Sequence, residues 1–114
     1  MVEGEMTDNE PDELFFTAQT PLNCSIRVTT AYWNIITQIK YPIMNGQEAA
    51  VQATLTQPDE IHRSRSDPNI YLFYKLQREN RWLCAVIRQL NGDGFLITTY
   101  PTDAIKEGET IWQK

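Results

Sequence analysis

The sequence is poor in the residues that build metal centres and disulfide frameworks. Its 114 residues include two cysteines, Cys24 and Cys84, and one histidine, His62. A structural zinc site needs about four clustered Cys or His ligands, and a disulfide framework needs several cysteine pairs. We therefore expect no metal site. Cys84 lies in an apolar run, and we interpret it as a small core residue.

A phosphate loop and long apolar segments are also missing. Gly92 and Gly94 follow a predicted strand but precede another strand rather than a helix, so we interpret them as hairpin glycines and expect no cofactor. Apolar runs such as Leu83–Ile87 are far shorter than the roughly 20 residues of a membrane span. The acidic start of the chain also differs from a secretory signal. These features predict a cytoplasmic protein without a membrane partner.

Positive charge is absent from residues 1–24, which contain six Asp and Glu residues and no Lys or Arg. The remaining chain holds all ten basic residues and nine of the fifteen acidic ones, with a basic centre between residues 60 and 92. We expect an acidic, flexible tail over residues 1–24 and a single domain over residues 25–114. The tail is either a solvated end or a shield that covers the basic centre in cis, with Phe15 and Phe16 as its anchor.

The hydrophobic pattern predicts helices first and strands afterwards. Thr29 and Thr30 offer an N-cap for a helix that ends near Lys40, with Tyr32, Ile35, Ile36 and Ile39 on its apolar face. A second helix is expected from Asn45 to Leu55. Strands are expected at residues 25–28, 61–65 (a possible edge strand), 70–76, 82–90 (central) and 95–100. This order predicts an α+β fold with two helices packed on one face of a three- to four-stranded antiparallel sheet, whose other face stays partly open.

Arginines stand out around residue 63. If residues 61–65 form a strand, Arg63 and Arg65 share a face about 7 Å apart, a spacing that suits a phosphodiester. Basic and aromatic residues follow in the next strands, and rings of this kind can stack on bases. These further candidates are Tyr71, Tyr74, Lys75, Arg81, Arg88, Thr98 and Tyr100. The alternatives are an edge strand decorated with charge, local ion pairs such as Arg65 with Asp67 or Arg88 with Glu48, and tyrosines that belong to the core.

An ordered series of segments resembles a known family. The segments are Val51–Ile61, Arg63–Pro68, Tyr71–Tyr74, Leu83–Arg88 and Gly94–Thr102. They resemble a group of small bacterial proteins of cyanobacterial type, which is similar to the nuclease-like fold shared by barnase, EndoU, colicins and RelE toxins. The resemblance covers about residues 27–112, and it implies a RelE- or barnase-like arrangement of helices and strands.

The resemblance also implies a function. It predicts a toxin-related, metal-independent ribonuclease, in which the RNA 2′-hydroxyl attacks its own phosphate and cations stabilise the charged intermediate. The implied catalytic residues are Arg63, Arg65, Arg81, Arg88, Thr98 and Tyr100, and the implied substrate-binding residues are Tyr71, Tyr74 and Lys75. Tyr41 stands where related sequences carry a histidine, and a phenol is a poor base at neutral pH. The alternative is therefore a non-catalytic module that holds RNA, a protein or a second copy of itself.

Overall fold

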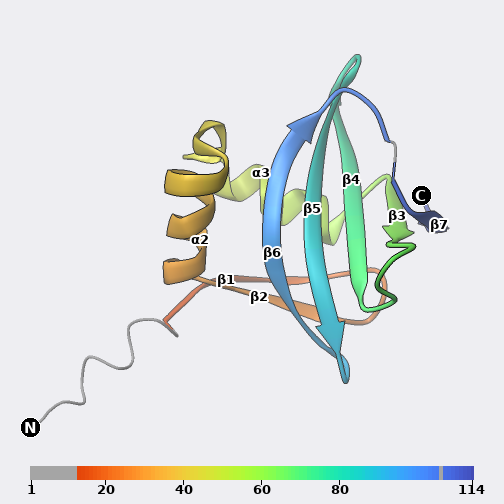
Figure 1. The fold of residues 1–114 in the computed structure, drawn as a ribbon, viewed down its shortest axis with the longest axis horizontal. Coiled ribbons are helices and arrows are strands. Elements are labelled where there is room, and N and C mark those ends of the chain that lie inside the picture. Colours follow the sequence, from red (N-terminus) through yellow and green to blue (C-terminus); the bar gives the residue numbers. More distant parts are fainter. Residues whose placement is uncertain (1–12, 106) are drawn as a thin grey trace, which may run out of the picture.

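The structure is a computed structural model that describes residues 13–105 and 107–114. Figure 1 shows the elements in these ranges, in the order β1 (Leu14–Gln19), β2 (Ser25–Thr29), α2 (Thr30–Ile35), η2 (Ile36–Lys40), η3 (Pro42–Met44), α3 (Glu48–Thr56), β3 (Glu60–Arg63), β4 (Ile70–Arg78), β5 (Arg81–Leu90), β6 (Asp93–Thr102) and β7 (Glu109–Gln113). No helix in these ranges is long and apolar enough to cross a membrane.

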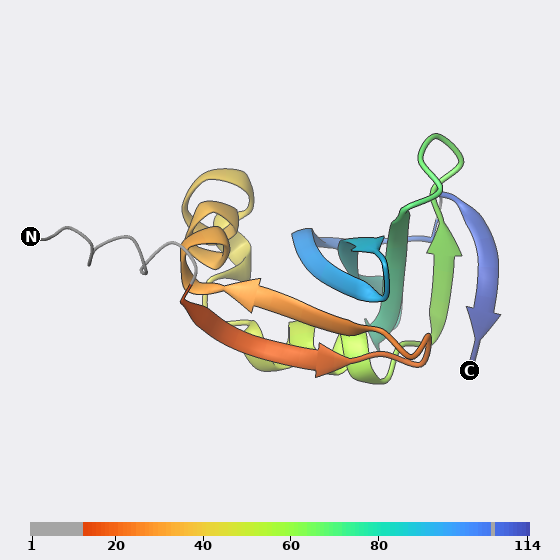
Figure 2. The same ribbon diagram turned by 90° about the horizontal axis from the view of Figure 1, so that it is seen from below.

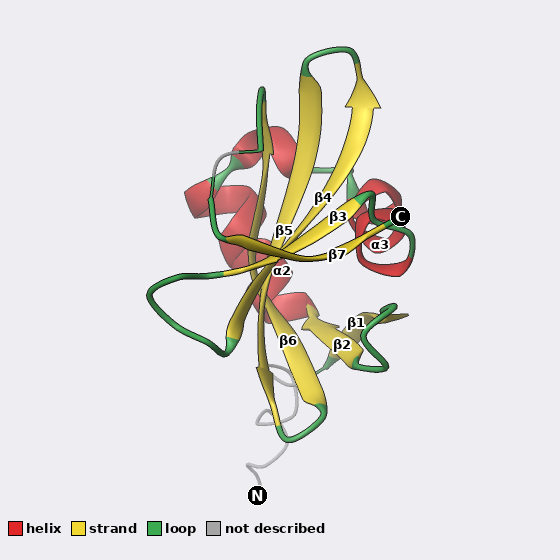
Figure 3. Cartoon of the chain, turned by 90° about the vertical axis from the view of Figure 1, so that its right-hand side faces the viewer, coloured by secondary structure: helices red, strands yellow, loops and turns green. Residues whose placement is uncertain are grey.

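The strands of the described ranges form one mixed sheet in the order β1-β2-β6-β5-β4-β3-β7. β2 and β6 run parallel, whereas the other neighbours are antiparallel. The strands fan out with a marked twist (Figure 3), as sheets of L-residues do. This seven-stranded mixed sheet shows that the expected three- to four-stranded antiparallel sheet is wrong. The chain passes through both helices and three strands before β6 returns beside β2, and a local pattern does not reveal such a distant pairing.

Strand β1 lies inside the stretch that was expected to be an acidic tail. It pairs with β2 from Leu14 to Gln19, and Ala18 on it is buried in the core. The rings of Phe15 and Phe16 lie 6.1 and 6.2 Å from the ring of Trp33. These contacts provide the burial energy that orders this part of the chain. The acidic residues of positions 1–12 lie outside the described residues.

At the other end of the chain, residues 109–113 form the edge strand β7, which pairs with β3. The expected edge strand at residues 61–65 is therefore an inner strand, and it ends at Arg63. Ile111 and Trp112 of β7 pack against the core. β5 occupies the middle of the sheet, which confirms the prediction made from its apolar composition.

The two helices do not share one face of the sheet, which corrects the second part of the predicted architecture. α3 lies behind the sheet, whereas α2 stands beside β6 (Figures 1 and 2). Thr29 caps α2 as predicted, since its side chain accepts a hydrogen bond from the backbone N–H of Tyr32. Trp33, Ile36 and Thr37 are buried, but Ile35 and Ile39 are exposed. The buried stripe is rotated because Trp33 packs on β1 rather than on the sheet centre.

Each strand therefore sends alternate side chains to two different faces. The first, which we call the α3 face, carries Ile61, Phe73, Ala85 and Ile87 and packs in one core with Val51 and Leu55 of α3. The second, which we call the tyrosine face, carries Leu72, Tyr74 and Cys84, with Trp82, Val86, Tyr100 and Ile105 packed around them. The link from β6 to β7 runs on this second side of the sheet, opposite α3 (Figure 2).

Candidate functional site

The residues predicted for the site are divided between the two faces. Arg63, Tyr71, Lys75 and Arg81 alternate with tyrosine-face residues along their strands and therefore belong to the α3 face. Tyr74, Arg88, Thr98 and Tyr100 belong to the tyrosine face. The cations expected to act together thus point to opposite sides of one sheet.

On the α3 face the predicted residues have structural partners. The guanidinium carbon of Arg63 lies 5.6 Å from the centre of the Tyr71 ring, an arrangement that favours a cation–π contact. Lys75 Nζ donates to the backbone oxygen of Gln57 at 2.8 Å, which fixes it beside the end of α3. Arg81, the first residue of β5, lines a pocket together with Arg78. None of these side chains meets Thr98 or Tyr100 in the described contacts.

Arg65 does not share a strand with Arg63, because β3 ends before it. Ser64 and Asp67 start turns, since their side-chain oxygens accept hydrogen bonds from the backbone N–H groups of Ser66 and Asn69. Short polar side chains of this kind compete with strand pairing. The expected alternation of Arg63 and Arg65 therefore fails. Arg65 instead donates a long, 3.4 Å hydrogen bond to the backbone oxygen of Gly108 beside β7.

On the tyrosine face the most prominent arrangement joins the end of η2 to β6. Pro42 ends the helical stretch, and the ring of Tyr41 lies 5.3 Å from the ring of Tyr100. Lys40 Nζ donates to the backbone oxygen of Ile97 at 3.3 Å and to the Tyr32 hydroxyl at 3.2 Å. Both acceptors are neutral, so no carboxylate of the described residues is paired with Lys40 by a salt bridge. We call Lys40, Tyr41 and Tyr100 the ring–cation platform.

Two predicted residues flank this platform. Thr98 precedes Tyr100 by two positions on the same face, and its hydroxyl is buried without a hydrogen-bond partner among the described residues. Unsatisfied buried groups of this kind are uncommon in native proteins. Arg88, further along the face, forms an ion pair with Asp67 at 3.2 Å. Its charge is therefore partly neutralised, but by Asp67 rather than by the expected Glu48.

The hydroxyl and thiol groups beneath the platform are held in their protonated forms. Burial raises the pKa of the Cys84 thiol to about 12, although its hydrogen bonds with Tyr100 and Tyr74 act in the opposite direction. Burial and the neighbouring Cys84 also raise the pKa values of Tyr74 and Tyr100. At neutral pH these groups donate hydrogen bonds and do not accept protons.

His62, which is not among the predicted site residues, has a structural role. It is 6% exposed; its Nδ1 lies 2.9 Å from the backbone oxygen of Glu107, and its Nε2 lies 2.8 Å from Glu60 Oε1. The histidine thereby ties the β6–β7 link to β3. The spacing of Glu60 and His62 in the sequence indicates this contact, because residues two apart in a strand share a face. His62 is not free to act as a base at the platform.

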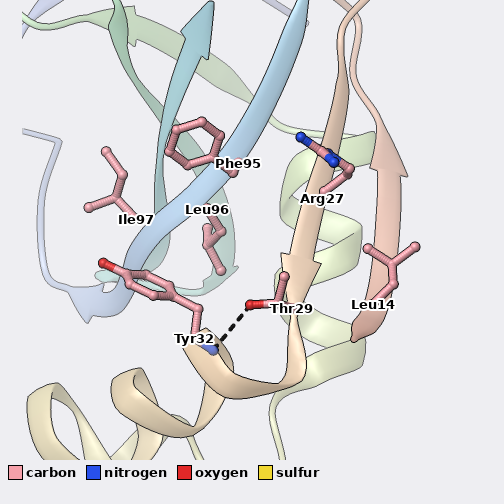
Figure 4. A pocket seen from close by; sticks show the side chains of 7 residues that line it. All are labelled: Leu14, Arg27, Thr29, Tyr32, Phe95, Leu96 and Ile97. Carbon is pink, nitrogen blue, oxygen red and sulfur yellow. Dashed lines mark hydrogen bonds between the residues drawn. The ribbon is translucent and has the colours of Figure 1, made fainter. Parts of the chain in front are cut away.

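A trough beside the platform was also missed. It has a volume of about 600 Å³, and its lining residues are Leu14, Arg27, Thr29, Tyr32, Phe95, Leu96 and Ile97. Figure 4 shows that these side chains come from β1, β2, α2 and β6. No composition signal pointed to the trough, because it depends on the parallel pairing of β2 and β6.

The described residues contain no group of three or more His, Cys, Asp or Glu side chains placed to hold a metal ion. No known protein family, curated protein or solved structure matches this chain.

Proposed function

We propose that this protein binds single-stranded RNA across the ring–cation platform. The observation that carries the proposal is the pairing of the Tyr41 and Tyr100 rings 5.3 Å apart, next in the chain to Lys40, whose hydrogen-bond acceptors among the described residues are neutral. Proteins that bind single strands combine aromatic rings, on which bases stack, with cations that contact the phosphates. Tyr41 is 39% exposed, so its ring is available to a base.

The expected metal-independent cleavage is proposed only as a minor activity. The platform supplies a cation and hydroxyl donors that could stabilise a charged phosphate intermediate. The raised pKa of Tyr100 keeps its hydroxyl protonated, and His62 is occupied by Glu60 and Glu107. No described group at the platform is therefore placed to take the proton of a 2′-hydroxyl, and a positioned base contributes about 10²- to 10⁴-fold to such a reaction. We expect cleavage in EDTA to be slower by about this factor than in an enzyme with a base.

The proposal also includes a compartment. Cys24 and Cys84 are both free and buried thiols, and free thiols persist in reducing compartments. We place the protein in the cytoplasm, where RNA is also available.

Binding is tested by fluorescence anisotropy with a labelled single-stranded RNA at low salt, in the presence of EDTA. Tyr100→Leu and Tyr41→Leu should each weaken binding about tenfold, as expected for the loss of one stacked base. Arg63→Gln is the control for a substitution outside the platform, because Arg63 is exposed on the opposite face of the sheet. Binding that is equal in all four proteins, or absent in the wild type, would contradict the proposal. The same samples on a denaturing gel measure cleavage.

A second candidate function is protein binding, and one observation favours it. Ile35, Ile39 and Ile43 are 39%, 74% and 62% exposed within one short helical stretch. Exposed apolar groups that gather in one place often mark an interface. Ile39→Lys should abolish self-association or partner binding if this stretch is the functional surface. The same substitution should leave RNA binding unchanged or strengthen it if the platform is the functional surface.

A further inference from the structure

The trough beside the platform is formed where two parallel strands separate. β2 and β6 pair only over Ser25–Arg27 and Asp93–Phe95. Beyond this point the strands diverge, and the N-terminal turn of α2 closes the other side of the space (Figure 4). The volume of about 600 Å³ falls within the range of about 300–1,000 Å³ that is typical of small-molecule sites.

The lining of the trough combines rings, apolar groups and one cation. Tyr32 comes from α2 and Phe95 from β6, so that two of the elements lining the trough each carry an aromatic ring. Phe95 is 41% and Leu14 is 51% exposed, so a ligand would remove apolar surface from water. Among the described residues, Arg27 is the only charged side chain of the lining, and no carboxylate belongs to it. Its ion pair with Asp93 is long, 3.8 Å, and exposed, so a phosphate can compete for it.

Lys40 connects the trough to the platform. Its Nζ donates to the hydroxyl of Tyr32 and to the backbone oxygen of Ile97, which both line the trough. The ring of the next residue, Tyr41, lies tilted against the ring of Tyr100 in the platform. An RNA strand that leaves the platform past Lys40 would therefore reach the trough within a short distance.

We propose that the trough holds one nucleotide of the bound RNA, with its base against the rings of Tyr32 and Phe95 and its phosphate on Arg27. This inference rests on the proposed RNA binding. The size of the trough accommodates a purine, and purines stack more strongly on aromatic rings than pyrimidines. We therefore expect AMP to bind more tightly than UMP, and adenosine, which lacks the phosphate, to bind more weakly than AMP.

The first arm of the test is independent of RNA. AMP, UMP and adenosine are titrated into the ¹⁵N-labelled full chain. AMP should shift the amide signals of Leu96, Ile97 and Thr29, and Phe95→Leu and Arg27→Gln should each reduce its affinity about tenfold. Leu90→Ala is the matched control for Phe95, because Leu90 has nearly the same exposure, 44%, outside the trough.

The second arm measures RNA affinity with the same variants. Phe95→Leu and Arg27→Gln should weaken RNA binding about tenfold, whereas Leu90→Ala should not. If Tyr100→Leu weakens RNA binding and the trough variants do not, the nucleotide inference is overturned and the proposed function stands. If AMP fills the trough but no RNA binds, the proposed function fails, and the part of the inference that assigns the nucleotide to a bound RNA is overturned with it; the trough then remains a site for a free nucleotide. Absence of AMP shifts at these amides, or a concentration-dependent dimer that excludes AMP from the trough, overturns the inference.

Discussion

Thr98 and Thr99 are neighbours on β6, yet only the hydroxyl of Thr99 has a hydrogen-bond partner among the described residues. Thr99 Oγ1 donates a 2.7 Å hydrogen bond to the backbone oxygen of Cys84 in the core. Thr98 Oγ1 points to the other face and is buried without a partner among the described residues. The two residues therefore form a natural pair for comparing a satisfied hydroxyl with an unsatisfied one.

The first prediction uses this pair. Thr98→Val should raise the free energy of unfolding by about 1 kcal/mol, because it removes a buried hydroxyl that has no hydrogen-bond partner among the described residues. Thr99→Val should lower it by about 1 kcal/mol, because a buried hydrogen bond is lost. Urea unfolding at neutral pH measures both changes. A destabilised Thr98→Val protein would indicate that the hydroxyl has a partner in solution.

The second prediction concerns Gly108, which precedes β7. Gly108 and Gly46 both have a positive φ, +83° and +84°, but only at Gly108 would a Cβ lie 2.6 Å from the backbone oxygen of Arg63. Gly46→Ala should lower the free energy of unfolding by about 1 kcal/mol, because of the strained backbone conformation alone. Gly108→Ala should lower the free energy of unfolding by clearly more than this, and it should weaken hydrogen-exchange protection in β7. An equal fall in the free energy of unfolding for the two substitutions would mean that β7 can shift away from β3 without a loss of stability.

The third prediction is a loss of stability at alkaline pH. The pKa of Cys84 is raised from 9.0 to about 12 in the folded protein, and those of Tyr74 and Tyr100 are raised in the same direction. The unfolded chain loses the thiol proton above about pH 9 and the phenol protons above about pH 10, while the folded chain retains them. The unfolded state then binds fewer protons, so stability falls as pH rises and is fully present below about pH 9.

Cys84→Ala tests this account by urea unfolding at a series of pH values. For the wild type, the Cys84 contribution should be a fall of about 1.4 kcal/mol per pH unit above pH 9. The variant should show a shallower fall in this range and no change in slope between pH 6 and 8. Parallel curves for the two proteins would show that Cys84 ionises in the folded state.

The fourth prediction is a change in the salt dependence of RNA binding. Each phosphate neutralised on a single strand contributes about −0.7 to the slope of log affinity against log salt concentration. Lys40→Gln should therefore make the slope shallower by about 0.7. Arg63→Gln should leave it unchanged, since Arg63 packs over Tyr71 on the other face. A slope that responds to Arg63 and not to Lys40 would place RNA on the α3 face.

The features that could be predicted from the sequence depend on neighbouring residues. Thr29 is the cap of α2, and Asn91 and Gly92 both have positive φ in the β5–β6 hairpin, as their residue types indicate. The apolar character of β5 was sufficient to place it centrally. Each of these features is determined within a few residues.

The features that were missed depend on distant partners. β1 and β7 are short, and their pairing with β2 and β3 requires contacts across the chain. The helical stretch of α2 and η2 has two stripes that could be buried, and Trp33, which packs on β1, is buried whereas Ile39 is exposed. Thr98 and Tyr100 were found as candidates, but the arginines could not be assigned to a face until the end of β3 at Arg63 was known.

The most direct test of the central claim is photo-crosslinking with a single-stranded RNA that contains 4-thiouridine, followed by mass spectrometry of the crosslinked peptides. The account predicts crosslinks in two segments, residues 40–41 and residues 95–100, because these carry the ring–cation platform and one wall of the trough. Crosslinks confined to Arg63, Tyr71 or Arg81 would contradict it, since these residues belong to the α3 face.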